Sequence, residues 1–409
     1  MPHVILVAPQ QPASQRRYLR GLVKAGALVS GVGQTRPERL EPEVRHLLHS
    51  YEHVHDLRDE DAFAAAVRRI QERGPWVDRL ETTGEEHLLP AARARARSAI
   101  PGLSVEQALF CSDKLRMKEH LAARGVPCAR HTEVSRAEDL ARFVAEVGYP
   151  VVLKPRVGSR AADSHRIDDA ESLELALAAA RVEDGEQSWV AEAFVEGHEG
   201  FYDTVMGDDG VAMEFASHYY PTVLEAMHTR WISPQVVHTN RLHQDGYDRV
   251  RELGQQVIGE LGLRSTATHM EWFHGPGGHH FSEIGARPPS SGFWDVYSEA
   301  NEIDVYTEWA RVLVRGKVEE SATHRFAAGL INLRPSQDGV VRGYSGVERM
   351  QRAYGEHIFR MHLPPPRTPT QPIGAGYLAN AWVCVKHPDY DELRGILDDI
   401  GRTVQVWAG

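Results

Sequence analysis

Two glutamates in the second half of the chain are placed to bind a cation. Glu271 and Glu283 lie in two alternating, strand-like runs, residues 266–273 and 280–287, which a turn rich in proline and glycine joins. Both are equidistant from Gly277, so a symmetric β-hairpin would place them opposite each other, with Cβ atoms about 5 Å apart. Because like charges repel at that distance, we expect a cation between them, and Mg²⁺ takes carboxylate oxygens that it shares with substrate phosphates. The alternative is a solvated hairpin edge that carries two unrelated glutamates.

Two lysines earlier in the chain are candidates for binding phosphate. Lys114 lies in the first turn of a helix predicted within residues 112–127, and Lys154 closes a strand-like apolar run. A loop of mostly small residues, 156–164, follows Lys154 and includes Ser159. Small residues let backbone N–H groups approach phosphate oxygens, and an adjacent lysine adds a point charge. The alternative is that each lysine extends along the surface with its ammonium group in water.

The segment 187–199 is a candidate for contacting a nucleotide base. It reads as a strand in which Glu192 and Glu199 flank an apolar pair, Phe194 and Val195. An exposed strand edge can hydrogen-bond an adenine, and carboxylates can accept from its amino group and from ribose hydroxyls. The same alternation of acidic and apolar residues is also common in any half-buried strand.

A stretch dense in aromatic and ionisable residues, 218–231, is a candidate substrate pocket. Glu225 and His228 are three residues apart, so they share one face if the segment is helical. Arg230 and Trp231 could line the same pocket, and Trp294 is expected to close it. The alternative for Glu225 and His228 is an ordinary surface turn of helix.

Alternating strands and helices over residues 1–110 predict a Rossmann-like α/β domain with a parallel sheet. No G-x-G-x-x-G follows the first strand, so dinucleotide binding of that type is not expected. The last hundred residues are predicted to form a small α+β lobe. The chain of 409 residues has a net charge of −11, which argues against nucleic acid as a partner. Its three cysteines are scattered, which fits a reducing compartment, and we expect a cytoplasmic protein. The first residues lack the charged region of a signal peptide, and no apolar run is long enough to predict a membrane segment.

In this order, the segments containing Lys114, Lys154, Glu192 to Glu199, Glu271 and Glu283 resemble the ATP-grasp superfamily over roughly residues 78–295. The resemblance implies that Lys114 and Lys154 hold ATP phosphates and that residues 156–164 form a phosphate lid. It also implies that Glu192, Phe194 and Val195 read the adenine and that Glu199 binds the ribose. Glu271 and Glu283 would bind Mg²⁺, with Mn²⁺ as a substitute, and Arg287 would lie near the transferred phosphoryl group. Gly285 stands where many members have a further Asn ligand.

Within the superfamily, Glu225-Ala-Met-His228 resembles a Glu-x-x-His pair of bacterial L-amino-acid ligases, the dipeptide synthetases. This implies that Glu225 meets a substrate ammonium and that His228 lies near an acyl phosphate. The expected organisation is residues 1–110, an ATP-grasp domain at 111–310 with a lid subdomain at about 127–197, and a lobe at 311–409, assembled as a homodimer. The expected activity is ATP-dependent joining of a small-molecule carboxylate to an amine. The alternatives are an ATP-grasp enzyme of nucleotide-precursor or biotin-carboxylase-like metabolism that uses formate or bicarbonate, and a non-catalytic nucleotide-binding protein.

Overall fold

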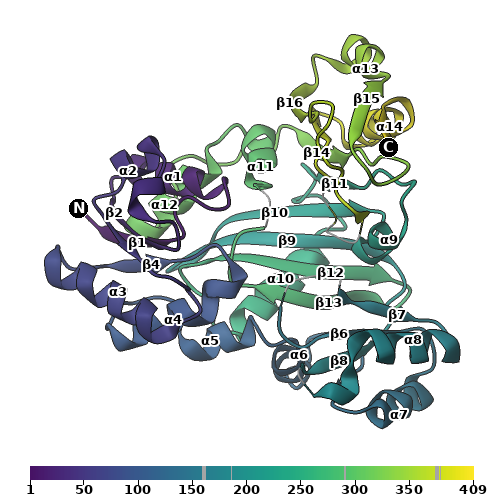
Figure 1. Ribbon diagram of the computed structural model, residues 1–409, viewed down its shortest axis with the longest axis horizontal. Helices are drawn as coiled ribbons and strands as arrows, with labels where there is room; N and C mark the ends of the chain where they lie inside the picture. The colour runs from purple at the N-terminus through teal and green to yellow at the C-terminus, as the bar shows by residue number, and fades with distance from the viewer. Residues whose placement is uncertain (159–162, 186, 290–291, 374–376, 378) are drawn as a thin grey trace.

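The N-terminal part of the protein is a parallel α/β unit (Figure 1). In this computed structural model, residues 1–409 are described except for 159–162, 186, 290–291, 374–376 and 378. Four parallel strands are arranged in the order β3-β2-β1-β4. The strands are β1 His3–Val7, β2 Leu28–Gly33, β3 Ser50–His53 and β4 Arg79–Glu81. The helices are α1 Gln15–Lys24, α2 Pro42–Leu47, α3 Glu60–Arg73, α4 Leu88–Arg97 and α5 Val105–Phe110, with short 3₁₀ turns at Pro37–Arg39 (η1) and Glu85–His87 (η2).

Both faces of this sheet are covered by helices, as its apolar sequence predicts. All five residues of β1 are buried, which is typical of a parallel strand enclosed on two sides. Val4 and Leu6 join a core cluster with α1 and α2, while Ile5 and Val7 join another with α3 and α4. The predicted Rossmann-like architecture is therefore confirmed.

A large antiparallel sheet forms the centre of the molecule (Figure 1). Its eight strands follow the order β13-β12-β9-β10-β11-β14-β17-β16. They are β9 His198–Gly207, β10 Gly210–Tyr220, β11 Gln235–His238, β12 Ala267–Gly275, β13 Gly278–Gly285, β14 Ala327–Asn332, β16 Ile358–His362 and β17 Trp382–His387. Alternate residues of β9 face opposite sides: Tyr202 and Met206 pack with α10 (Asp248–Glu260), and Phe201 and Val205 pack with α11 (Trp294–Asn301) and α12 (Val305–Arg315).

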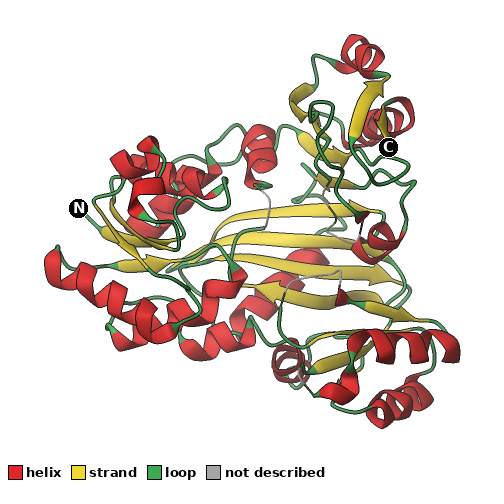
Figure 2. Ribbon diagram, in the orientation of Figure 1, coloured by secondary structure: helices red, strands yellow, loops and turns green. Residues whose placement is uncertain are grey.

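A smaller four-stranded sheet, here called the lid sheet, lies beside the β12–β13 edge of the central sheet (Figure 2). Its order is β5-β8-β6-β7. Its strands are β5 His131–Val134, β6 Val151–Pro155, β7 His165–Ile167 and β8 Trp189–Ala193, with helices α7 Ala137–Val147 and α8 Ala170–Ala180 and a 3₁₀ turn, η4, at Val182–Asp184. Helix α6, Lys114–Ala122, precedes the lid sheet and begins at the N-cap Asp113, as the sequence predicts.

Three of the strands after residue 311, β14, β16 and β17, belong to the central sheet and do not form a separate sheet. β14, β17 and β16 extend the central sheet through pairing of β14 with β11. The remaining elements are α9 Val223–His228, α13 Val347–Tyr354, α14 Tyr390–Thr403 and a two-stranded sheet of β15 Val341–Ser345 and β18 Gln405–Ala408. The domain boundary expected near residue 311 stays a prediction, because one sheet continues across it.

The expectation that Trp294 closes a substrate pocket is wrong. Trp294 is 1 % exposed, and its ring packs against Tyr18, Tyr306 and Trp309, where α1 meets α11 and α12. Burial of this large aromatic surface stabilises the junction of the N-terminal part and the central part. Gly21 lets the helices approach closely, since a Cβ there would lie 2.5 Å from the Tyr306 carbonyl oxygen.

The three cysteines, Cys111, Cys128 and Cys384, are free thiols. Within the described ranges, the helices are too short or too polar for any of them to cross a bilayer.

Candidate active site

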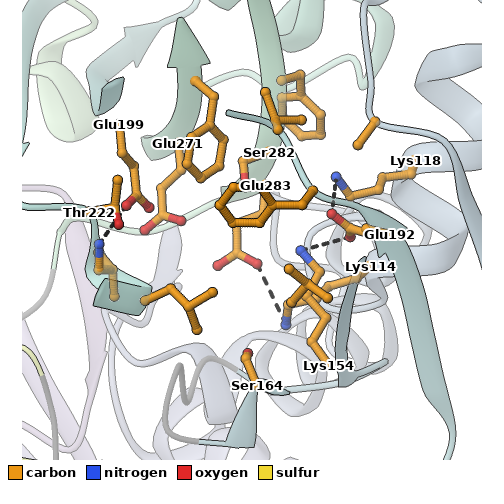
Figure 3. Close-up of a pocket in the computed structure, with 18 of the residues that line it drawn as sticks. Lys114, Lys118, Lys154, Ser164, Glu192, Glu199, Thr222, Glu271, Ser282 and Glu283 are labelled. Atoms are coloured by element: carbon orange, nitrogen blue, oxygen red, sulfur yellow. Dashed lines mark hydrogen bonds and ion pairs between the residues drawn. The ribbon is translucent and has the colours of Figure 1, made fainter. Parts of the chain in front are cut away.

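The hairpin of β12 and β13 brings the two glutamates together as predicted. Glu271 and Glu283 are directly opposed in the register, and both side chains point into one cavity (Figure 3). The route to this register differs from the expectation. The tight turn pairs Gly275 with Gly278, which alone would set Glu271 against Ser282, and an irregularity after Glu271 shifts the partner to Glu283.

Three lysines, two of them buried and Lys154 partly buried, line the opposite side of the cavity. Figure 3 shows Lys114, Lys118 and Lys154 grouped around Glu192, with Glu199, Glu271 and Glu283 across from them. Lys154 Nζ lies 2.7 Å from Glu192 Oε1, and Lys118 Nζ lies 3.1 Å from Glu192 Oε2. Two cations on one carboxylate leave this side of the cavity positive.

Lys114 connects the lid loop to the hairpin. Its ammonium group donates to the carbonyl of Gly158 and lies 3.7 Å from Glu283 Oε2. The start of the same loop is tied to the N-terminus of α6, because Arg156 binds the N-cap Asp113 and the Lys114 amide donates to the Arg156 carbonyl at 2.9 Å. Ser159 lies outside the described residues, and its predicted role stays a prediction.

Lys118 is a site residue that the sequence interpretation missed. It is fully buried, and its ammonium group also lies 5.7 Å from the centre of the Phe281 ring. The signal was present, since Lys118 follows Lys114 by four residues and therefore lies on the same helix face. Two of six lysines on one face of one short helix indicate a site that binds negative charge.

Burial alone would raise the pKa of the Glu192 carboxyl, but Lys118 and Lys154 lower it to about 2. Burial and then the nearby charge of Glu271 raise the pKa of Glu199 to about 8. Burial also opposes ionisation of Glu283, and Lys114 and Lys154 nonetheless hold its pKa below the usual value. The carboxylates closest to the lysines are thus fixed in the charged form, whereas Glu199 retains its proton more readily.

The residues predicted to contact the base line the same cavity. Phe194 and Val195 follow the end of β8, and the Arg166 guanidinium lies 4.3 Å from the centre of the Phe194 ring. Glu199 is 4 % exposed, and its Oε2 accepts from the Val223 amide at 2.6 Å, at the N-terminus of α9. Apolar and charged walls meet here, an arrangement suited to a ring system that carries an anionic tail.

Glu225 and His228 lie in a helix, α9, which is the condition under which they share one face, but both side chains are exposed. They line a neighbouring cavity with His165 and Arg166, and this cavity shares Phe194, Thr222 and Leu224 with the glutamate–lysine cavity. Trp231, expected nearby, is 86 % exposed, and Arg230 is paired with Asp338. The substrate roles of Glu225 and His228 therefore stay predictions.

Arg287 is buried beside the hairpin and paired with a residue of the N-terminal part. Its Nη2 lies 2.9 Å from Glu85 Oε2, in the 3₁₀ turn Glu85–His87. Burial lowers the pKa of the guanidinium, but Glu85 outweighs that effect and the net shift is upward. The sequence interpretation did not identify Glu85, because its partner lies 202 residues further along the chain.

The donor set fits a hard divalent cation that is shared with a ligand. In the described part of the chain, no group of three or more His, Cys, Asp or Glu side chains is arranged to hold a metal. Two facing carboxylates are nevertheless what Mg²⁺ commonly takes from a protein, because phosphate and water supply its other ligands.

Comparison with known proteins agrees with this geometry. Residues 119–302 match the ATP-grasp domain family. The chain is 28 % identical to the L-arginine-specific L-amino acid ligase of Bacillus subtilis over 178 residues, 42 % of this chain and 43 % of the relative. It is 23 % identical to the formate-dependent phosphoribosylglycinamide formyltransferase of Corynebacterium jeikeium over 87 % of each chain.

The fold is also similar to that of a solved L-amino acid ligase. The crystal structure of an L-amino acid ligase from Bacillus licheniformis superposes with a TM-score of 0.76 at 17 % identity, covering 100 % of this chain and 99 % of that one. The chain spans about half the length of the curated amino acid ligases it matches. Residues 119–302 therefore form an ATP-grasp domain.

Proposed function

We propose that this protein is an ATP-dependent carboxylate–amine ligase that activates the carboxylate of an amino acid and joins it to an amine. The observation that carries the proposal is the cavity in which Glu271 and Glu283 face Lys114, Lys118 and Lys154. Such a cavity suits a polyphosphate with its divalent cation, and the ATP-grasp domain supports ATP as that ligand.

The reaction follows from the chemistry of a carboxylate, which is a poor electrophile at neutral pH. A carboxylate oxygen attacks the γ-phosphorus of ATP, the bond to the β-phosphate oxygen breaks, and ADP leaves. The amine then attacks the carbonyl carbon of the acyl phosphate, loses a proton, and phosphate departs with the electron pair of the broken C–O bond. The protein has to position the groups, stabilise charge and exclude water.

The lysines and glutamates divide these tasks. Lys114 and Lys154 bind the phosphates, while Lys118 shares Glu192 with Lys154, so the one carboxylate does not neutralise both lysines. Glu271 and Glu283 hold Mg²⁺, which Mn²⁺ can replace, and the bound ion neutralises charge shared by the β- and γ-phosphates. Phe194 and Val195 cover the adenine, and Glu192 and Glu199 lie beside the base and the ribose. Gly158 and Ser164, in the described parts of the predicted lid 156–164, line the same cavity.

Arg287, Glu225 and His228 serve the other substrates in this proposal. The Arg287 guanidinium binds a carboxylate or the transferred phosphoryl group at the end of the hairpin, where Glu85 now pairs with it. Glu225 accepts from a substrate ammonium, and His228 donates to the acyl phosphate. Their cavity adjoins the nucleotide cavity through Thr222 and Leu224, which line both.

A screen of amino acid pairs for ATP-dependent phosphate release tests the proposal. The expected result is release that requires both members of a pair, with a product lighter by one water than the sum of the two, as mass spectrometry would show. Release with one amino acid alone, or no release with any pair, would contradict the assignment of amino acids as substrates.

A second candidate is a ligase of nucleotide-precursor metabolism that uses a small acid. It is favoured by the similarity to the formate-dependent formyltransferase, which extends over 87 % of both chains. Formate with glycinamide ribonucleotide belongs in the same screen. Turnover with this pair and with no amino acid pair would replace the first candidate by the second.

A further inference from the structure

A buried polar chain lies directly behind Glu271. His269 precedes Glu271 by two residues in β12, so both side chains lie on one face of the strand. The His269 Nδ1 lies 2.6 Å from Asp203 Oδ1, and its Nε2 lies 3.7 Å from Glu271 Oε1. Tyr297, from α11, donates its hydroxyl to Asp203 Oδ2 at 2.5 Å.

The burial of Asp203 makes this arrangement rigid. Asp203 is 1 % exposed, and a buried carboxylate is costly unless hydrogen-bond donors surround it. A carboxylate only accepts, so the Tyr297 hydroxyl and His269 Nδ1–H both donate to Asp203. With Nδ1 occupied, the other nitrogen of the ring is directed at Glu271.

The surrounding rings hold the imidazole in this orientation. The Phe201 ring meets the His269 ring at 4.9 Å with an interplanar angle of 63°. Phe201 is also the strand partner of Glu271, and Asp203 is the strand partner of His269. Register and packing thus fix Asp203, His269 and Glu271 in one row.

We propose that His269, held by Asp203 and Tyr297, is a positioning residue that sets the place of the Glu271 carboxylate and thereby the affinity of the site for its divalent cation. The inference rests on the proposed function, which makes Glu271 a metal ligand. Groups that hold a ligand side chain from behind commonly change metal affinity 10–100-fold when they are replaced.

Two amide substitutions at position 269 test the two interactions of the histidine separately, the one with Asp203 and the one with Glu271. His269→Asn keeps a donor near the place of Nδ1, toward Asp203, and loses the group facing Glu271. His269→Gln places its amide near Nε2 and weakens the link to Asp203. Thr268→Val is the control, because the Thr268 and Thr204 hydroxyls form a buried hydrogen bond of 2.7 Å on the opposite face of the same strands.

The experiment titrates Mn²⁺ into protein with ADP and measures free Mn²⁺ by electron paramagnetic resonance. We expect His269→Asn to raise the Mn²⁺ dissociation constant about 10-fold or more, His269→Gln to raise it less, and Thr268→Val to leave it unchanged. ADP affinity in EDTA should be the same in all four proteins. The readout is metal binding and needs no turnover.

Equal Mn²⁺ affinity in His269→Asn and wild type would overturn the inference, even if the variant were less stable. If neither His269 variant folds, Tyr297→Phe decides, since it removes one hydroxyl: a dissociation constant raised about threefold or more supports the inference, and an unchanged one overturns it. A wild-type protein that binds no Mn²⁺ with ADP would instead contradict the proposed function itself.

Discussion

At the scale of single residues, the site consists of three lysines and four glutamates whose opposite charges face one another. Lys118 shows what a sequence interpretation could have found from helical spacing, and Glu85 shows what it could not. The partner of Glu85 is Arg287, and nothing local in the chain brings these two residues together. The types of the phosphate-binding residues could be predicted because lysines are rare in this chain.

Lys154 gives a prediction at this scale. Lys154→Ala should weaken binding of a non-hydrolysable ATP analogue by about 10-fold or more, because a partly buried point cation facing phosphate is lost. Lys154→Arg should weaken it less, since the charge remains while its shape changes. Isothermal titration calorimetry measures both. Lys24→Ala is the control, because Lys24 is exposed and pairs with Asp304 far from the cavity. Wild-type affinity in Lys154→Ala would place this lysine outside the nucleotide site.

At the scale of secondary-structure elements, the β12–β13 hairpin decides the geometry of the metal site. Its existence follows from alternation and from the Pro-Gly turn, but its register depends on an irregularity that no residue type signals. The spacing of Glu225 and His228 places them on one face only if the segment is helical, and α9 meets that condition. The cavity that its exposed face lines depends on how α9 packs, which is a tertiary property.

The hairpin gives the second prediction. Glu271→Gln and Glu283→Gln should each leave the fold intact and reduce ATP turnover by about 10²–10³-fold, because the ion that neutralises the transferring group loses a charged ligand. Coupled-enzyme detection of ADP measures the rate, and circular dichroism checks folding. The exposed Glu252 of α10 offers a control through Glu252→Gln. A folded variant of either hairpin glutamate with nearly normal turnover would refute the metal assignment.

A buried histidine in the central sheet gives the third prediction. His238 in β11 is fully buried, with Nδ1 3.0 Å from the Ala216 carbonyl and Nε2 3.2 Å from Asn301. Burial lowers its pKa from 6.5 to about 3. Between these two pKa values the His238 side chain binds a proton in the unfolded chain but not in the folded protein. Its contribution to the free energy of unfolding is therefore fully present above pH 6.5 and is lost as the pH drops toward 3.

His238→Asn should reduce this pH dependence, because asparagine can still donate to the Ala216 carbonyl and does not titrate. One such group contributes up to about 1.4 kcal/mol per pH unit to the slope of the unfolding free energy. Urea unfolding at pH 7.5 and pH 5 measures the slope in wild type and variant. Identical slopes would show that His238 does not control acid stability.

At the scale of the whole molecule, two sheets line one cavity, and the N-terminal part packs beside them. The central sheet supplies Glu271 and Glu283, and the lid sheet supplies Lys154. The N-terminal part pairs Glu85 with Arg287, just beyond the hairpin. The classes of these sheets could be predicted from the periodicity of the strands. The joining of β14 to β11 could not, because strands far apart in sequence carry no mark of their partner. Trp294 was misplaced for a related reason: its ring neighbours come from two other helices, α1 and α12.

The central claim is that the protein activates a carboxylate by phosphorylation, and an isotope experiment tests it most directly. An amino acid that the screen identifies as the acid is labelled with ¹⁸O in its carboxylate and turned over with ATP and the amine. If an acyl phosphate forms, one carboxylate oxygen must leave with the phosphate. The account predicts one ¹⁸O atom per released phosphate, seen as a shifted ³¹P resonance. Amide formation with unlabelled phosphate would contradict the account.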